Sequence, residues 1–335
     1  MRRSLPRSVA LGALAAIAAA GTAIAHGPVP SAPPDVANLV LGWSIEPAVL
    51  LPLAIAAFGW LRVVARIDHA HPSNRVPRRR TVAFLGGLAA IAIALMSGID
   101  TYDTTLFSVH MVQHLLLTLV AAPLIALAAP ITTLLRAATP NVRQRVLLPI
   151  LHSRVMRILS FPVVTWILFA ATMWGTHFSP LFDASLENPV IHDLEHGLYL
   201  TVGLLFWWPA VGLDPSPWRM PHPVRAMYVF LQMPQNTFLA VTILNSSAVL
   251  YHHYATLVRS WGPSALDDQQ IAGGLMWICG DILFLSAMAA ILAGWMRHEK
   301  DREVAVDRRL DAERAAIRVR EAQLAERLAT ERDAH

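Results

Sequence analysis

Long apolar runs separated by short polar connections dominate this chain. Seven of them approach the roughly 20 residues that a helix needs to cross the hydrocarbon core of a bilayer. Runs of this length are typical of membrane helices, in which the backbone polar groups are satisfied within the segment. The pattern therefore predicts an all-α, polytopic membrane helix bundle of about seven transmembrane helices, at 43–64, 81–99, 106–128, 158–176, 192–212, 224–245 and 271–296.

Basic residues in the polar connections predict the orientation. Arginines gather in the first, third and fifth connections, within 62–80, 136–157 and 219–225, whereas the alternate connections hold only Arg259. Basic residues stay on the cytoplasmic side of a membrane. We therefore expect the N-terminus outside and the C-terminus inside.

The two ends of the chain differ from the bundle. The first 25 residues combine three arginines with an apolar stretch that ends in Ala23-Ile24-Ala25, which is typical of a signal peptide; an uncleaved signal anchor is the alternative. Either way, 26–42 becomes an outer N-terminal segment and 43–296 the transmembrane domain. Residues 297–335 are rich in Arg, Glu and Ala and lack Pro and Gly, so they predict a charged cytoplasmic helical tail.

Composition limits the available chemistry. Of the 335 residues, 55% are hydrophobic and only 15% are charged, against roughly 25% charged in a soluble domain. The net charge of +4 does not indicate nucleic acid, because the arginines lie between apolar runs and in the tail without interleaved aromatic residues. Cys279 is the single cysteine, so a metal site would use His, Met and carboxylates rather than thiolate pairs.

Histidines collect at the outer end of the predicted bundle. His110 and His114 are four residues apart, as are His192 and His196, so each pair shares one helix face about 6 Å apart along the axis. If the two helices are neighbours, the four imidazoles meet at one depth and can chelate one metal ion. Hydrogen bonding to loop carbonyls is the plainer alternative. The other outer histidines are His26, His177, His252 and His253.

Further donors are expected at the same level. Met276 lies early in the last span, and Met111 and Met173 lie near the same depth. Imidazoles suit Cu(II) or zinc and thioethers suit Cu(I), so the combination favours copper. Acidic residues that can orient the imidazoles are Glu46, Asp100, Asp103, Asp193 and Glu195.

Other chemistries fit parts of this pattern. Residues 192–196 match H-x-x-E-H, the inverted zinc-protease motif, although they lie where a helix enters the bilayer. A single haem with one axial histidine from each of two helices also fits, whereas two stacked haems would need histidines about 13 residues apart on each helix. Copper uptake or efflux is less favoured, because the inner halves of the spans lack a charged or Met-rich lining.

Seven short motifs follow one another along the chain. They are 110–114 (HMVQH), 122–123 (AP), 177–181 (HFSPL), 190–196 (VIHDLEH), 206–209 (FWWP), 214–215 (DP) and 268–277 (DQQIAGGLMW). Together they resemble those of the CtaG-type cytochrome c oxidase assembly factors of bacterial membranes. The resemblance runs from about residue 40 to 296 and leaves out the leader and the tail.

This resemblance implies an integral protein of the bacterial plasma (inner) membrane that helps to mature a haem–copper oxidase by supplying copper to its outer-facing centre. Its partners would be haem–copper oxidase subunits and membrane lipid, with no nucleic acid, and it would not be an enzyme. A metal-free scaffold that holds an unfinished oxidase together is the alternative. We expect copper to bind transiently to His110, His114, His192 and His196, followed by His177 and then Met276.

Overall fold

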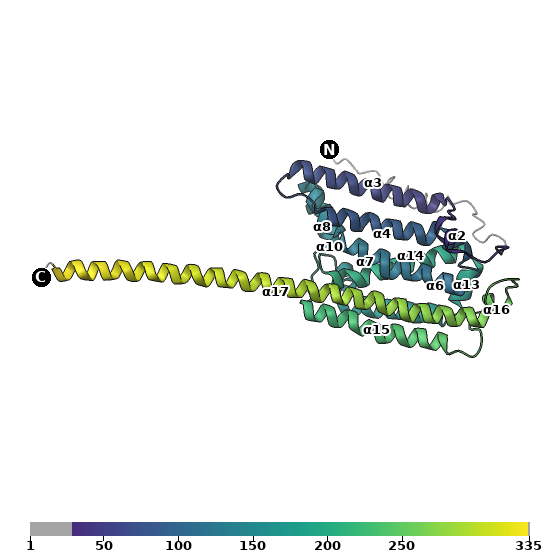
Figure 1. Ribbon diagram of the computed structural model, residues 1–335. Helices are drawn as coiled ribbons and strands as arrows, with labels where there is room; N and C mark the ends of the chain where they lie inside the picture. Colours follow the sequence, from purple (N-terminus) through teal and green to yellow (C-terminus); the bar gives the residue numbers. More distant parts are fainter. Residues whose placement is uncertain (1–28, 334–335) are drawn as a thin grey trace, which may run out of the picture.

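The computed structural model describes residues 29–333, so the expected signal segment, its cleavage site and His26 lie outside the described residues. Within 29–333 the chain contains helices and no strand, and the long helices lie side by side in one bundle (Figure 1). In chain order the elements are α2 (Val36–Leu41), α3 (Pro47–Ala70), α4 (Arg78–Met96), α5 (Gly98–Tyr102), α6 (Phe107–Leu115), η1 (Leu116–Ala121), α7 (Ala122–Leu127), α8 (Pro130–Ala137), α9 (Pro140–Val142), η2 (Arg143–Leu147), α10 (Leu148–Leu151), α11 (Arg154–Leu159), α12 (Pro162–His177), α13 (Leu181–Glu187), α14 (Pro189–Val211), α15 (His222–Leu244), α16 (His252–Thr256) and α17 (Ala265–Asp333).

Among the residues that the structure describes, four helical segments are long and apolar enough to cross a membrane, as expected of a membrane protein. Helices α12, α14 and α15 coincide with the other three predicted spans, but α12 has only 16 residues, fewer than the roughly 20 that a bilayer requires. The all-α class is confirmed, whereas the count of seven spans and the orientation stay predictions. The four segments are Pro47–Ala70, Arg78–Tyr102, Phe107–Ala137 and Ala265–Leu324.

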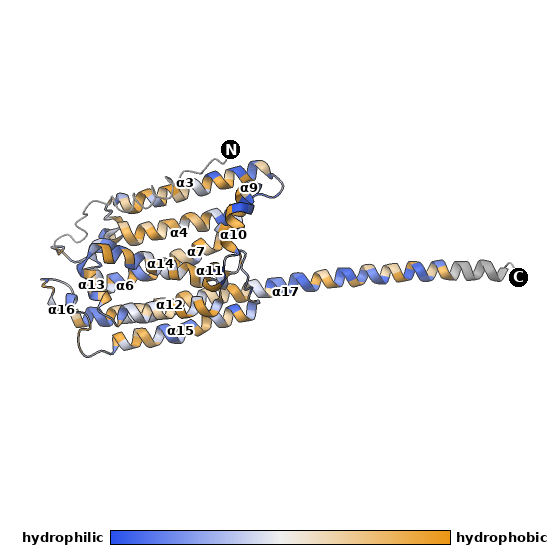
Figure 2. Ribbon diagram, turned by 180° about the vertical axis from the view of Figure 1, so that it is seen from behind, coloured by the Kyte–Doolittle hydropathy of each residue, from blue (hydrophilic) through white to orange (hydrophobic). Residues whose placement is uncertain are grey.

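Short helices close the two ends of the bundle. Helices α2, α13 and α16 gather at one end, and α8 and α10 lie at the other, from which α17 projects (Figure 1). Apolar residues dominate the bundle, whereas the projecting part of α17 is mostly hydrophilic (Figure 2). This tail is helical, as its composition predicts, but no break separates it from the bundle, because α17 continues for 69 residues.

Helix α3 continues beyond the predicted end of the first span. Arg62 and Arg66 therefore lie within the helix rather than in the connection where we expected them. The Arg62 guanidinium lies 4.8 Å from the centroid of the Phe58 ring, so the long side chain extends over an aromatic neighbour. On the other side of the helix, the Trp60 ring stacks on Phe84 of α4 with centroids 4.3 Å apart, which attaches α3 to the edge of the bundle.

Small residues bring α14 close to the helical run formed by α6, η1 and α7. A Cβ on Gly203 would lie 3.1 Å from the Cβ of Ala122 and 3.3 Å from the Cα of Thr118, so a larger residue would require the facing helix to move by a few tenths of an ångström. Thr118 belongs to η1, a π-helical turn, and its carbonyl accepts a 2.8 Å hydrogen bond from Trp207 Nε1 of α14. Such turns often occur beside functional sites. Here the turn directly follows α6, which carries two of the predicted ligands.

Candidate metal site

Five buried imidazoles, those of His110, His114, His177, His192 and His196, form what we call the histidine cluster. Helix α6 supplies the first two, the last residue of α12 is His177, and α14 supplies the other two. Ring centroids are 4.2 Å apart within each pair spaced by four residues. Between helices they are 5.4 Å apart for His110 and His192, 6.1 Å for His114 and His196, and 6.3 Å for His114 and His177. The structure therefore gathers all the predicted imidazole ligands.

The two α6 histidines face each other through their Nε2 atoms, which are 2.9 Å apart. One Nε2 must carry the shared proton and the other must accept it. Two nitrogens bonded at about 2.0–2.1 Å to one metal ion lie about 2.8–3.4 Å apart, so an ion can take the place of that proton with little movement of the rings. The Nδ1 atoms of His110 and His114 have no hydrogen-bond partner within the described residues.

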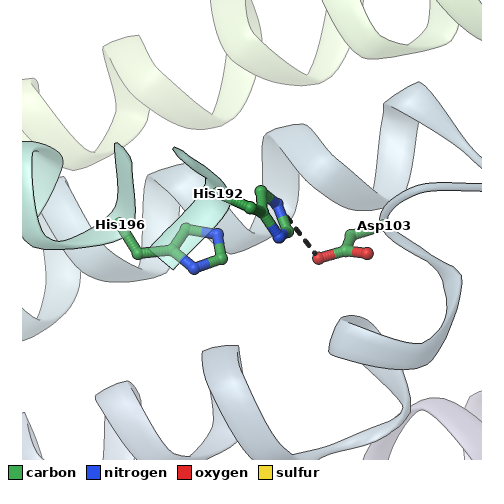
Figure 3. A group of neighbouring side chains, drawn as sticks. All are labelled: Asp103, His192 and His196. Atoms are coloured by element: carbon green, nitrogen blue, oxygen red, sulfur yellow. Dashed lines mark ion pairs between the residues drawn. The ribbon is translucent and has the colours of Figure 1, made fainter. Parts of the chain in front are cut away.

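Two buried carboxylates adjoin the histidine cluster. Asp103 Oδ2 lies 3.6 Å from His192 Nε2 (Figure 3), and Glu195 Oε2 lies 4.0 Å from His110 Nε2. Burial raises the pKa of Asp103 well above its usual value, and a bound cation would favour its ionised form. Two groups of side chains have ligand atoms within 4.8 Å of one another: Asp103, His192 and His196, and His110, His192 and Glu195.

Gln113 connects the two histidine helices, a role that the sequence pattern did not single out. Its side-chain amide donates a 3.0 Å hydrogen bond to the Ala94 carbonyl, and its Oε1 accepts one of 3.0 Å from His196 Nε2. Because Oε1 only accepts, Nε2 of His196 carries the proton and the lone pair lies on Nδ1. Gln113 is three residues after His110 and so lies on the same helix face. This spacing is the feature of the sequence that could have indicated its role.

A small cavity adjoins the histidine cluster and is lined by His114 and His177 together with Met111, Met173 and Met276. Its volume of about 20 Å³ holds one water-sized occupant. His177 Nδ1 donates a 2.7 Å hydrogen bond to the Met173 carbonyl, which leaves the lone pair on Nε2. That Nε2 has no hydrogen-bond partner within 29–333. The cavity thus contains Met276, the last of the predicted ligands, in its lining. His114 and His177 belong both to this lining and to the histidine cluster.

Tyr199 of α14 fixes the rings at the boundary between the cluster and the cavity. Its ring stacks on His114 with centroids 4.0 Å apart and planes 21° apart. Its hydroxyl lies 2.5 Å from Thr176 Oγ1 and 3.3 Å from His177 Nδ1. A fully buried tyrosine with these contacts restricts the orientation of both histidines. The sequence pattern does not indicate this role, because one tyrosine in an apolar helix is an ordinary packing residue.

Asp268, near the start of α17, holds the beginning of α6. Its carboxylate accepts a 2.7 Å hydrogen bond from the Phe107 backbone N–H and one of 2.5 Å from Ser108 Oγ. The first backbone N–H groups of a helix have no partner inside the helix, so this carboxylate acts as a cap from another helix. It fixes the position from which His110 and His114 project.

Two further described histidines that we predict at the outer end, His252 and His253, lie outside the cluster. His252 is exposed, and His253 Nε2 donates a 2.8 Å hydrogen bond to the Thr104 carbonyl. The backbone N–H groups of both residues donate to the Asp183 carboxylate, at 3.3 and 3.0 Å. Asp193 is also exposed, so of the two acids beside the α14 histidines only Glu195 joins the site.

Comparisons with known proteins agree with the motifs. Uncharacterized proteins of Mycobacterium bovis and Mycobacterium tuberculosis are each 30% identical to this chain over 290 residues, which cover 84% of it and 44% of the relative. A similar protein of Mycobacterium leprae is 30% identical over 288 residues. The chain thus spans less than half the length of the curated relatives it matches. No solved structure matches it.

Residues 57–298 match the family model described as cytochrome c oxidase caa3 assembly factor. This region contains the whole histidine cluster, the cavity and the four capping or orienting residues Asp103, Gln113, Tyr199 and Asp268. The resemblance read from the motifs is therefore confirmed, and the chain belongs to the cytochrome c oxidase caa3 assembly factor family.

Proposed function

We propose that this protein binds copper in the histidine cluster, at the outer face of a bacterial plasma membrane, and aids its insertion into a haem–copper oxidase. The observation that carries the proposal is the convergence of five buried imidazoles, in which the Nε2 atoms of His110 and His114 lie 2.9 Å apart and His177 Nε2 has no hydrogen-bond partner in the described residues. Buried polar atoms are nearly always hydrogen-bonded, and leaving one unsatisfied costs about 1–3 kcal/mol. A metal ion bound to His177 Nε2 would remove that cost, and an ion between the two facing Nε2 atoms would take the place of their shared proton.

The donor set favours copper over other metals. Imidazole nitrogens bind Cu(II) more tightly than other divalent ions of the first transition row, and the adjoining thioethers suit Cu(I). Magnesium and calcium prefer oxygen ligands, whereas the donors of the cluster are imidazole nitrogens with the carboxylates of Asp103 and Glu195 beside them. Family membership supplies the destination, because the family assembles cytochrome c oxidase.

Delivery requires that copper leave again, and the cluster has features that suit release. Its ligands come from three helices, so small movements of α6 against α14 change the distances between imidazoles of different helices. Its imidazoles have neutral forms that can take up a proton when the ion departs. The acceptor would be an oxidase subunit in the same membrane, and the protein itself would catalyse no covalent step.

The metal content of the purified full-length protein tests this proposal. Wild type, His114→Ala, His196→Ala and the exposed control His252→Ala are loaded with copper, desalted and compared by elemental analysis and absorption spectroscopy. We expect copper in wild type and His252→Ala and its loss in the two cluster variants. In cells, the same two variants should lower the copper content of the oxidase.

Other outcomes would replace the proposal. Absence of bound metal in wild type after loading would favour a metal-free scaffold. A Soret band would indicate a haem carrier, and selective retention of zinc would favour the hydrolase suggested by the motif at 192–196. Equal copper in all four proteins would mean that copper binds elsewhere.

A further inference from the structure

We propose that the cavity beside the histidine cluster is a separate site that holds copper as Cu(I), with thioether and imidazole ligands. The inference rests on the proposed function and adds the oxidation state and a second position for the ion. Three thioethers, those of Met111, Met173 and Met276, line the cavity with the imidazoles of His114 and His177. Met111, Met173 and Met276 come from three different helices, α6, α12 and α17.

The charge of the lining distinguishes this cavity from the rest of the cluster. Among the described residues, no Asp, Glu, Lys or Arg lines it, whereas Asp103 and Glu195 belong to the two groups of close ligand atoms that contain His192. Burying a cation without a compensating carboxylate is costly, and the cost rises steeply with charge. A neutral lining therefore favours a monovalent ion, while the carboxylate-containing groups favour a divalent one.

The size of the cavity also favours Cu(I). A volume of about 20 Å³ holds one water-sized occupant, so an ion must enter without its hydration shell. Hard cations such as Mg²⁺ lose water reluctantly. Cu(I) is soft and binds thioether sulfur and imidazole nitrogen in place of water.

His177 supplies a prepared ligand for this site. The hydrogen bond from its Nδ1 to the Met173 carbonyl fixes the tautomer, so the lone pair lies on Nε2. That Nε2 is buried and has no hydrogen-bond partner within 29–333. The Tyr199 hydroxyl, 3.3 Å from Nδ1, further restricts the ring. A plain packing role for His177 would leave this nitrogen unsatisfied.

His114 belongs to both positions. It lines the cavity, which is the inner position, and its Nε2 lies 2.9 Å from His110 Nε2. We call the position at His110, beside His192 and Glu195, the outer position. Copper would therefore have two adjacent positions that share one imidazole. The outer position offers carboxylates and imidazoles, and the inner position offers thioethers and imidazoles.

Cu(I) binding by the full-length protein in detergent, under anaerobic conditions, tests the proposal. Cu(I) is titrated in competition with the chromophoric chelator bicinchoninate, and the bound ion is examined by X-ray absorption. The variants are Met173→Leu/Met276→Leu and the control Met288→Leu, which changes another partly buried methionine of α17. Leucine keeps nearly the same volume, so folding should be retained, and thermal unfolding checks this.

We expect sulfur scattering around Cu(I) in wild type and Met288→Leu, and at least a tenfold loss of Cu(I) affinity in the double variant. Binding of Zn²⁺, which prefers the carboxylate-containing groups, should be the same in all three proteins. Cu(I) held by nitrogen and oxygen alone, or with equal affinity in all three, would overturn the thioether site and leave the proposed function standing. Failure of wild type to bind copper in either oxidation state would overturn both.

Discussion

Helices α6 and α16 lie at the same end of the bundle, and each carries two histidines and begins on a carboxylate from another part of the chain. Asp268 caps α6, and Asp183 accepts from the first N–H groups of α16. The outcomes for the imidazoles differ. Those of α6 are buried against each other, whereas His253 of α16 bonds a loop carbonyl and His252 is exposed.

Spacing explains the difference. Residues four apart share one face of a helix, so His110 and His114 both point into the bundle and towards α14. Adjacent residues such as His252 and His253 point about 100° apart on a helix, so they do not face a common ion. The position of a histidine at this end of the bundle is therefore not sufficient for membership in the site. A second histidine on the same face, and a facing helix, are also needed.

The largest expected effect is the rise in Tm that copper causes. This rise should depend on the histidine pair of α6 and not on the pair of α16. A ligand that binds only the folded state at 100 times its dissociation constant adds about 2.7 kcal/mol to the free energy of unfolding. Copper should therefore raise the Tm of wild type and of His252→Ala/His253→Ala but leave that of His110→Ala/His114→Ala unchanged. Thermal unfolding in detergent, with and without copper, measures this. A copper-dependent rise of equal size in the α6 variant would remove the distinction between the pairs.

A smaller effect is expected when the two capping carboxylates, Asp268 at α6 and Asp183 at α16, are compared. Asp268→Asn and Asp183→Asn should each lower the free energy of unfolding by about 1 kcal/mol, because each weakens a cap at a helix start. Asp268→Asn should also lower copper affinity by about tenfold, since it moves the helix that carries two ligands. Copper titration of the two variants makes the comparison. If Asp183→Asn weakens copper binding as much, then the cap at α6 has no special role.

The smallest combined effect concerns His253 alone, because its substitution should change stability without changing copper affinity. His253→Ala removes one hydrogen bond to the Thr104 carbonyl and should lower the free energy of unfolding by about 0.5–1.5 kcal/mol. Its copper affinity should equal that of wild type. Thermal unfolding and copper titration of the same preparation provide both values. A changed copper affinity would mean that α16 contributes to the copper site.

The sequence was sufficient for the parts of the site that depend on periodicity. The four-residue spacing of His110 and His114, and of His192 and His196, places each pair on one face, and the structure brings these faces together. The helical class and the family followed from apolar runs and motifs in the same way.

Long-range contacts were not predictable from the sequence. The cap from Asp268 to α6 joins residues 160 or more positions apart, and periodicity carries no information about it. Gln113 and Tyr199 were missed because their roles depend on which helix faces them. The length of α3 was underestimated, since arginines within a helix resemble those of a connection until their side chains are placed.

The continuity of α17 has a mechanical consequence. One helix of 69 residues contains the cap for α6 at Asp268, the cavity residue Met276 and the charged tail, and at about 1.5 Å per residue it is about 100 Å long. If the helix moves as one rigid rod, a tilt of a few degrees that slightly displaces Met276 would displace Asp333 by several ångströms. A protein bound to the projecting tail would then be coupled to the candidate metal site at the opposite end of the bundle.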